Sequence, residues 1–171
     1  MNELITTILE RRSVREYQPK PVDRAQLFFL VQAGDFAPSA MNQQGRKIVA
    51  LSNRARIDEM LTAGGIDGDR DPYYGAQTAI VVFADKECIA PAEGASLSLE
   101  NMMLAAHALG LGSCWIHIVT RIFETEAGKE LQKKWGVPEN YFAVGSIAVG
   151  TPAGPLPDPK PRKQGVVTII D

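Results

Sequence analysis

The sequence predicts a single domain that combines helices with a central β-sheet. Its 171 residues, of which 45% are hydrophobic and 22% charged, suffice for one globular domain with a sizeable core. Residues 95–109 are apolar on nearly every side of a helical wheel, as is typical of a buried helix. Residues 79–84 (AIVVFA) form a continuous apolar run, which is typical of a central strand covered on both faces.

The other elements follow from hydrophobic periodicity and from residues that begin or end helices. Further helices are expected over residues 3–11, 23–36, 52–61 and 121–135. Further strands are expected over residues 47–51, 111–116, 142–149 and 166–170. Asp23 and Ser52 are suited to cap the helices that follow them, whereas Gly110 and Gly136 are suited to end helices.

Two segments lack a regular pattern. Residues 64–75 (GGIDGDRDPYYG) form a long loop rich in glycine and aspartate, and loops of this length are typically lids or disordered. Residues 151–161 hold five prolines and predict an extended arm that carries the strand at 166–170. A hydrophobic strand at the end of such an arm needs a pairing partner, for which a second subunit is suited.

Composition and motifs exclude several classes of function. The net charge of −2 gives no reason to expect nucleic acid or an acidic membrane as a partner. The N-terminus does not resemble a signal peptide and the apolar helix is too short to span a bilayer, so we expect a cytoplasmic protein. The sequence lacks the dinucleotide-binding, phosphate-loop and serine-elbow motifs. A domain without its own acid, base and nucleophile is suited to cofactor chemistry.

The two cysteines are too few for a disulfide framework. Cys114 and His117 form the nearest approach to a metal-binding pair, but no second pair stands at zinc spacing. We therefore expect no metal site. A buried thiol beside a polar strand end is the favoured interpretation of Cys114.

Two basic clusters are candidates for an anion site. Arg11, Arg12, Ser13 and Arg15 follow directly on the first helix, and arginine forks with a hydroxyl are suited to phosphate oxygens. The alternative is a solvated basic helix end that complements the helix dipole. The second cluster, on the arm, favours phosphate, because two distant cationic segments can converge on one dianion. That cluster consists of Lys160, Arg162 and Lys163.

Two further segments have both a ligand-binding and a purely structural interpretation. The polar loop at residues 38–44 offers amides and a hydroxyl, which suit a heteroatomic ring or a ribityl chain, or simply form a turn. Gly110 and Gly112 either bring the backbone close to a flat ligand or serve as an ordinary helix cap.

The ordered set of these segments resembles the FMN-dependent nitroreductase family over essentially the whole chain. The matching stretches are RRSVREY, APSAMNQQ, ENMMLAAHALGLGSCWI, AVGTP and KPRK. The resemblance implies one α+β domain spanning residues 1–171, with a mixed, mainly antiparallel central sheet flanked by helices. It also implies a homodimer in which the C-terminal arm and strand are exchanged and FMN lies at the interface.

The resemblance implies a cofactor site made of several segments. Arg11, Arg12 and Ser13 would hold the phosphate and ribityl oxygens of FMN, joined by Lys160 and Arg162 from the arm. The loop residues that would reach FMN, the first two from the other subunit, are Pro38, Ser39, Asn42 and Gln44. The residues that would run beneath the ring, with backbone groups near its reactive nitrogen, are Trp115, Ile116 and His117.

The implied activity is hydride transfer from NAD(P)H through the flavin to a small acceptor such as a nitroaromatic compound or a quinone. No side chain would act as acid, base or nucleophile, and Arg15, placed over the pyrimidine end of the ring, would stabilise the reduced flavin electrostatically. The alternative is an FMN-binding carrier or redox sensor without nicotinamide turnover. Gly45-Arg46, His117-Ile118 and the shortness of the chain depart from what is common in the family, so the resemblance implies FMN binding but does not fix the substrate.

Overall fold

The computed structural model describes residues 2–66 and 70–170. Four strands form one sheet in the order β1-β2-β4-β3, and all three pairings are antiparallel. The strands are β1 (Arg46–Leu51), β2 (Thr78–Asp85), β3 (Gly112–Ile116) and β4 (Tyr141–Gly150). Ser13 and Ser113 form an isolated parallel bridge beside the sheet. This arrangement confirms the predicted α+β class and the inner position of the strand at 79–84.

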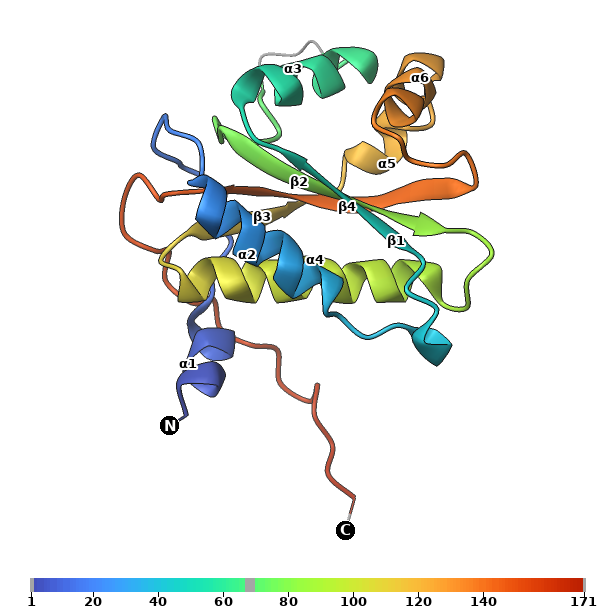
Figure 1. Cartoon of the computed structure of the whole chain (residues 1–171). Coiled ribbons are helices and arrows are strands. Elements are labelled where there is room, and N and C mark those ends of the chain that lie inside the picture. Colours follow the sequence, from blue (N-terminus) through green and yellow to red (C-terminus); the bar gives the residue numbers. More distant parts are fainter. Residues whose placement is uncertain (1, 67–69, 171) are drawn as a thin grey trace.

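Helices cover both faces of the sheet (Figure 1). On one face lie α2 (Arg24–Asp35) and α4 (Pro91–Ala108), and on the other lie α3 (Arg54–Ala63), α5 (Val119–Ile122) and α6 (Glu126–Lys134). The first helix, α1 (Glu3–Glu10), projects from the body beside α4. A short 3-10 turn, η1 (Ala40–Asn42), precedes β1.

The strand β2 is apolar over most of its length because both of its faces are packed. Ile80 and Val82 belong to the core cluster under α2 and α4, whereas Val81 and Phe83 belong to the cluster under α3, α5 and α6. All four side chains are fully buried. The alternation follows from the period of two along a strand, so a continuous apolar run is the pattern expected for a two-sided core.

The long helix α4 begins four residues before the predicted start, because Pro91 occupies its first turn, where a missing N–H costs nothing. It ends as predicted, with Gly110 in the left-handed region at φ +73. One face is buried through Leu99 and Met102. The prediction that α4 is buried on nearly every side is wrong for the single chain. The side chain of Leu97 is 46% exposed when the described residues are taken together.

Two predicted helices differ in detail from the observed ones. Asn53, not Ser52, caps α3, because the Asn53 side chain accepts a hydrogen bond from the amide of Arg56. The helix predicted at residues 121–135 is wrong as one unit, since the chain forms α5 and α6 with a break between them. Thr125 has extended backbone angles, and its Oγ accepts a hydrogen bond from the amide of Gly128 at 2.9 Å. Thr125 therefore caps α6 and separates it from α5.

The break between α5 and α6 gives a testable stability prediction. A Cβ at Gly128 would lie 2.0 Å from the carbonyl oxygen of Ile122, a backbone atom that cannot turn away. Gly128→Ala is therefore expected to lower the free energy of unfolding by about 3 kcal/mol. Urea denaturation measures this loss. Gly94→Ala is the matched control, because a Cβ there meets its nearest atom at an ordinary 3.7 Å, and an equal effect of both substitutions would contradict the steric explanation.

The arm after β4 is extended, as predicted, and runs away from the body past α1 (Figure 1). The predicted strand at residues 166–170 is absent from the described part of the chain, where these residues pair with no other strand. The physical reason is the lack of a partner for their backbone groups. The four apolar side chains of this segment, at residues 166, 167, 169 and 170, are all at least 73% exposed. Among the described residues, no helix is long and apolar enough to cross a membrane.

Candidate functional site

The segment after α1 is fixed along the edge strand β3. The amide of Val14 donates to the carbonyl of Ser113 at 3.0 Å, and the Val14 side chain is buried. Gly112 makes this approach possible, because a Cβ there would lie 2.6 Å from Cγ2 of Val14. Val14 of the same chain fills the space beside Gly112, and the approach of this backbone to a ligand remains a prediction. The anchoring places Ser13 and Arg15 beside β3.

The first two arginines of the cluster have different partners. Nη1 of Arg12 donates to the carbonyls of Leu9 at 2.7 Å and Arg11 at 2.9 Å, so Arg12 caps the end of α1, as the structural alternative expects. Nε of Arg11 lies 3.5 Å from a carboxylate oxygen of Glu100 in α4. Nη1 of Arg11 is buried and has no hydrogen-bond partner among the described residues. Arg11 therefore keeps a donor that an anionic ligand could satisfy.

A second unpartnered group belongs to the β-bridge between Ser13 and Ser113. The backbones of Ser13 and Ser113 pair in this bridge. The side-chain hydroxyl of Ser113 is buried and has no hydrogen-bond partner among residues 2–66 and 70–170. Buried hydroxyls are normally hydrogen-bonded, so an unpartnered one is a candidate contact for a bound molecule. Sequence analysis did not identify Ser113, whose only signal is its place in GLGSCW.

Arg15 is exposed and lies over an aromatic ring that sequence analysis missed. Its guanidinium carbon is 5.9 Å from the centroid of the Tyr74 ring, and the contact with Tyr74 together with nearby Cys114 raises the arginine pKa. Tyr74 has φ +55, an uncommon conformation for a tyrosine. The only signal in the sequence is the pair of adjacent tyrosines before a glycine, PYYG. A cation held on a ring at the surface suits a flat anionic ligand.

The residues at the end of β3 line two cavities. Trp115 is half-buried and rests on Gly145, where a Cβ would lie 2.6 Å from the indole. Ile116 is buried, and His117 is exposed just beyond the strand. A cavity of about 380 Å³ is lined by Tyr74 together with Trp115, Ile116 and His117. A larger cavity of about 1040 Å³ shares Trp115 and His117.

The larger cavity lies where the sheet is incomplete. β3 pairs with β4 only from Ser146 to Gly150, whereas β4 begins at Tyr141. Within the described residues, the first half of β4 therefore leaves one edge unpaired, and the cavity extends from this edge to α6 and to the first turns of α4. An open sheet edge beside an indole and an imidazole offers backbone donors and acceptors to a bound molecule.

The loop at residues 38–44 lies at the opposite end of α4 from the basic cluster. Gln43 accepts a hydrogen bond from the amide of Ile89, just before α4, and Ser39 lies 3.7 Å from a Cβ position at Gly94. Within the loop, Ser39 Oγ accepts from the amide of Gln44, and the Asn42 side chain accepts from that of Gln44. Pro38, which precedes them, is exposed. Within a single chain, this loop lies away from Arg11 and Arg15. The contact of the loop with FMN bound to the partner subunit remains a prediction.

The second basic cluster also stands apart in the single chain. Lys160 and Arg162 lie on the exposed arm and make no ion pair within the described residues. Their convergence with Arg11 on one phosphate remains a prediction. Cys114 is buried and His117 is exposed, and no group of three metal-binding side chains occurs in residues 2–66 and 70–170.

Comparison with known proteins identifies the family. The model of the nitroreductase family matches residues 8–151. An Archaeoglobus fulgidus protein with the provisional name NADH dehydrogenase/NAD(P)H nitroreductase is 31% identical over 157 residues, which cover 89% of this chain and 87% of the relative. A Bacillus subtilis protein named FMN reductase (NADPH) is 27% identical over 194 residues, covering 97% of this chain and 73% of the relative.

A solved structure agrees with this assignment. The crystal structure of a nitroreductase with bound FMN from Bacteroides fragilis superimposes with a TM-score of 0.93 at 29% identity and covers all of both chains. The family match extends over most of the sequence, and the fold agrees from end to end. The chain therefore belongs to the nitroreductase family.

Proposed function

We propose that this protein is an FMN-dependent oxidoreductase that uses NAD(P)H to reduce small acceptors such as nitroaromatic compounds or quinones. The observation that carries the proposal is the buried Nη1 of Arg11, unpartnered among the described residues, next to Arg12, Ser13 and Arg15. A phosphate oxygen would satisfy that donor. The relatives named as FMN reductase and NAD(P)H nitroreductase, and the neighbour with bound FMN, support the same cofactor and co-substrate.

The residues of the site divide into those for the phosphate and those for the ring. Arg11, Ser13 and the buried hydroxyl of Ser113 offer donors on the side of α1 and α4. Tyr74, Trp115 and His117 line the smaller cavity, where a ring would lie, and Arg15 stands over the Tyr74 ring. FMN, when bound, supplies the hydride chemistry. The chain itself would supply position and positive charge, and Trp115 would help to exclude water from the ring.

The proposal includes a ping-pong order, in which NAD(P)H leaves before the acceptor enters the same cavity. The purified protein is expected to be yellow and to lose its flavin absorbance when NADH or NADPH is added without oxygen. Acceptor added afterwards should restore the absorbance. A yellow protein that neither nucleotide bleaches would favour the carrier or sensor alternative, and a protein that binds no FMN would overturn both.

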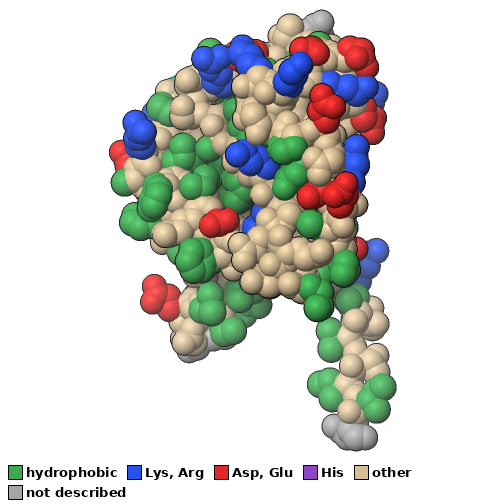
Figure 2. Space-filling model, turned by 45° about the vertical axis from the view of Figure 1, so that its right-hand side comes forward, with side chains coloured by type: hydrophobic (Ala, Val, Ile, Leu, Met, Phe, Trp, Pro, Cys, Tyr) green, Lys and Arg blue, Asp and Glu red, His purple; other side chains and the backbone are tan. Residues whose placement is uncertain are grey.

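We further propose a homodimer in which each arm crosses to the partner. Exposed apolar side chains on α1 and at the end of the arm support this proposal, because such surfaces are costly in water. Figure 2 shows hydrophobic side chains on the two segments that project below the body, which are α1 and the arm. On α1 these are Leu4, Ile5, Ile8 and Leu9, each at least 46% exposed. The partner's loop at residues 38–44 would then reach the FMN. The cytoplasmic location stays a prediction from the sequence.

The thiols are not expected to take part in the reaction. Burial raises the pKa of Cys114 above its ordinary value, although Arg15 and Ser13 partly oppose this shift, so the thiol stays neutral and unreactive near pH 7. Cys114→Ala should keep the rate of anaerobic flavin reduction within several-fold, with a modest loss of stability from packing. Cys88→Ala is the control at a half-buried position. Abolished reduction with FMN still bound would show that the Cys114 thiol participates.

A further inference from the structure

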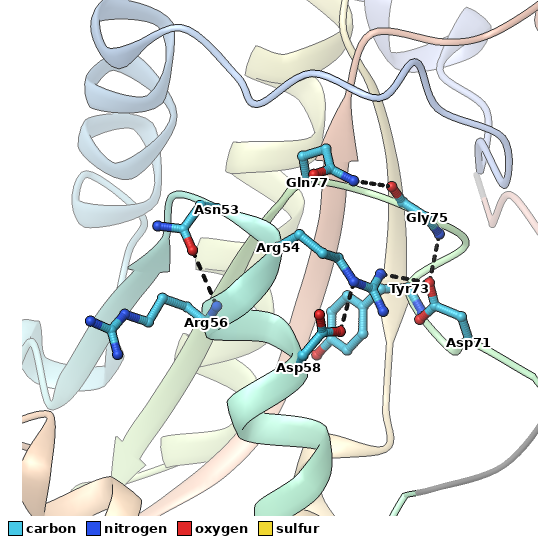
Figure 3. Close-up of polar contacts among 8 residues, drawn as sticks. All are labelled: Asn53, Arg54, Arg56, Asp58, Asp71, Tyr73, Gly75 and Gln77. Carbon is cyan, nitrogen blue, oxygen red and sulfur yellow. Dashed lines mark hydrogen bonds and ion pairs between the residues drawn. The ribbon is translucent and has the colours of Figure 1, made fainter.

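The turn that carries Tyr74 is built around one carboxylate. The two oxygens of Asp71 accept from the amide of Tyr73 at 2.9 Å and from the amide of Gly75 at 2.7 Å (Figure 3). The backbone of Tyr74 adds a bond from its amide to the Asp71 carbonyl at 3.2 Å. Tyr74 and Gly75 both have positive φ, at 55 and 75. Since a tyrosine rarely adopts this conformation unaided, the carboxylate is what holds the turn.

An ion pair with Arg54 holds the carboxylate of Asp71 in place. Nη1 of Arg54 lies 2.6 Å from Asp71 and its Nε lies 2.8 Å from Asp58 in the same helix, α3 (Figure 3). Burial alone would raise the pKa of Asp71, but the hydrogen bonds from Arg54, Gly75 and Tyr73 outweigh burial and lower it. Asp71 is therefore charged at neutral pH, and its hydrogen bonds to the turn are charge-assisted ones.

The turn points the side chain of Tyr73 into the core, where it is linked through Ser146 to the end of β3. Tyr73 is fully buried and its hydroxyl lies 2.7 Å from Oγ of Ser146 in β4. Ser146 Oγ in turn donates to the carbonyl of Ile116 at 3.0 Å. A hydroxyl has one proton to give, so Tyr73 donates to Ser146 and Ser146 donates to Ile116. These two hydrogen bonds fix Ile116, the last residue of β3, which lines the smaller cavity.

The same turn sends Tyr74 outward to the candidate ring site. The centroid of the Tyr74 ring lies 5.9 Å from the guanidinium carbon of Arg15, and Tyr74 lines the smaller cavity with Trp115 and His117. The side chain of Asp71 thus holds the turn that carries two adjacent tyrosines, one bonded to Ser146 and the other lining the smaller cavity. One tyrosine supports the backbone at Ile116, and the other carries the cation.

We propose that Asp71, held by Arg54, is a positioning residue for the flavin site, because its turn sets both the Ile116 carbonyl and the Arg15 guanidinium. The proposal rests on the proposed function, since FMN is the ligand to be positioned. Asp71 itself lines neither cavity within residues 2–66 and 70–170. Its effect on the flavin must therefore pass through Tyr73 and Tyr74.

The test compares Asp71→Ala and Asp71→Asn with Asp58→Ala as the matched control. Asp58 pairs with the same arginine but makes no bond to the turn among the described residues. With FMN saturating, Asp71→Ala should lower the ratio of affinities for reduced and oxidised FMN by about tenfold, or about 30 mV for two electrons. Asp71→Asn keeps one acceptor for the Tyr73 amide and should lose less. Asp58→Ala should leave the ratio unchanged.

A second readout uses the apoprotein. Amide hydrogen exchange at Tyr73 and Gly75 should quicken in Asp71→Ala without any cofactor, which reports the turn independently of FMN. If the turn loosens but the affinity ratio is unchanged, the positioning role is overturned. Should Asp71→Ala fail to fold, Asp71→Asn decides by the same two measurements. Wild-type protein that binds no FMN would instead refute the proposed function.

The route of the effect is tested by a double substitution. If Asp71 acts mainly through Arg15, adding Asp71→Ala to Arg15→Ala should change the affinity ratio no further, because the cation it positions is already gone. A full, additive tenfold loss in the double variant would overturn the route through Tyr74 and leave only the one through Ile116.

Discussion

A chain shortened to residues 1–154 is expected to be monomeric and to bind FMN at least about 100-fold more weakly than the full chain. The truncation removes Lys160 and Arg162, and each charged hydrogen bond to phosphate contributes about 1.5–3 kcal/mol. Two such contacts correspond to about 10²–10⁴ in the dissociation constant. The truncation also removes the exposed apolar residues 166–170, which pair with no strand in the described part of their own chain.

Sedimentation and FMN titration measure the two losses separately. The double variant Lys160→Ala/Arg162→Ala is the matched control, because it keeps residues 166–170 and removes only the charges. It should stay dimeric while binding FMN more weakly. A shortened chain that is still a dimer with unchanged FMN affinity would show that the arm neither crosses to the partner nor reaches the phosphate.

Most of the fold can be predicted because the periodicity of the core is visible directly in the sequence. The strand at 79–84 is apolar at every position since helices cover both faces, and few arrangements besides a two-sided core produce such a run. Caps formed by single side chains are equally local. The prediction that Asp23 caps a helix is confirmed by its bonds from the amides of Ala25 and Gln26. Such features depend only on residues close in the chain.

The errors arise where distant residues decide the outcome. The break at Thr125 depends partly on the carbonyl of Ala63, which accepts from the Thr125 hydroxyl at 2.9 Å, so a window around residue 125 does not reveal it. Residues 166–170 have the composition of a strand, but a strand needs a partner, and the described part of the single chain offers none. Leu97 looks like a core residue in the sequence because its neighbours are apolar, yet it stays partly exposed in one chain.

The candidate site can be predicted in part for the same reason. Arg11, Ser13 and Arg15 lie together because they are neighbours in sequence, and Trp115 and His117 lie at the end of the strand beside them. Tyr74 joins them only through the turn made by Asp71, within the loop at residues 64–75, whose length is typical of a lid or a disordered loop. Residues 67–69 of that loop lie outside the described residues, whereas Ile66 and Tyr74 pack against the core.

Removing Arg15 is expected to lower the reduction potential of bound FMN by roughly 30 to 60 mV. Reduced flavin carries more negative charge than oxidised flavin, so a cation beside the ring binds the reduced form more strongly. The Arg15 guanidinium carbon lies 5.9 Å from the centroid of the Tyr74 ring, and Tyr74 lines the smaller cavity together with Trp115 and His117. A hydrogen bond to a charged partner contributes about 1.5–3 kcal/mol, and 30 mV corresponds to about 1.4 kcal/mol for two electrons.

The phosphate residues supply the contrast that separates redox tuning from simple binding. Phosphate keeps its charge when the ring is reduced, so Arg162→Ala should weaken both redox states of FMN about equally and leave the potential unchanged. Arg11→Ala should behave in the same way, since Arg11 pairs with Glu100 of α4 rather than with Tyr74. The potentials are measured with FMN saturating. An unshifted potential in Arg15→Ala would move Arg15 from the ring to the phosphate group, because only a cation near the ring distinguishes the two redox states.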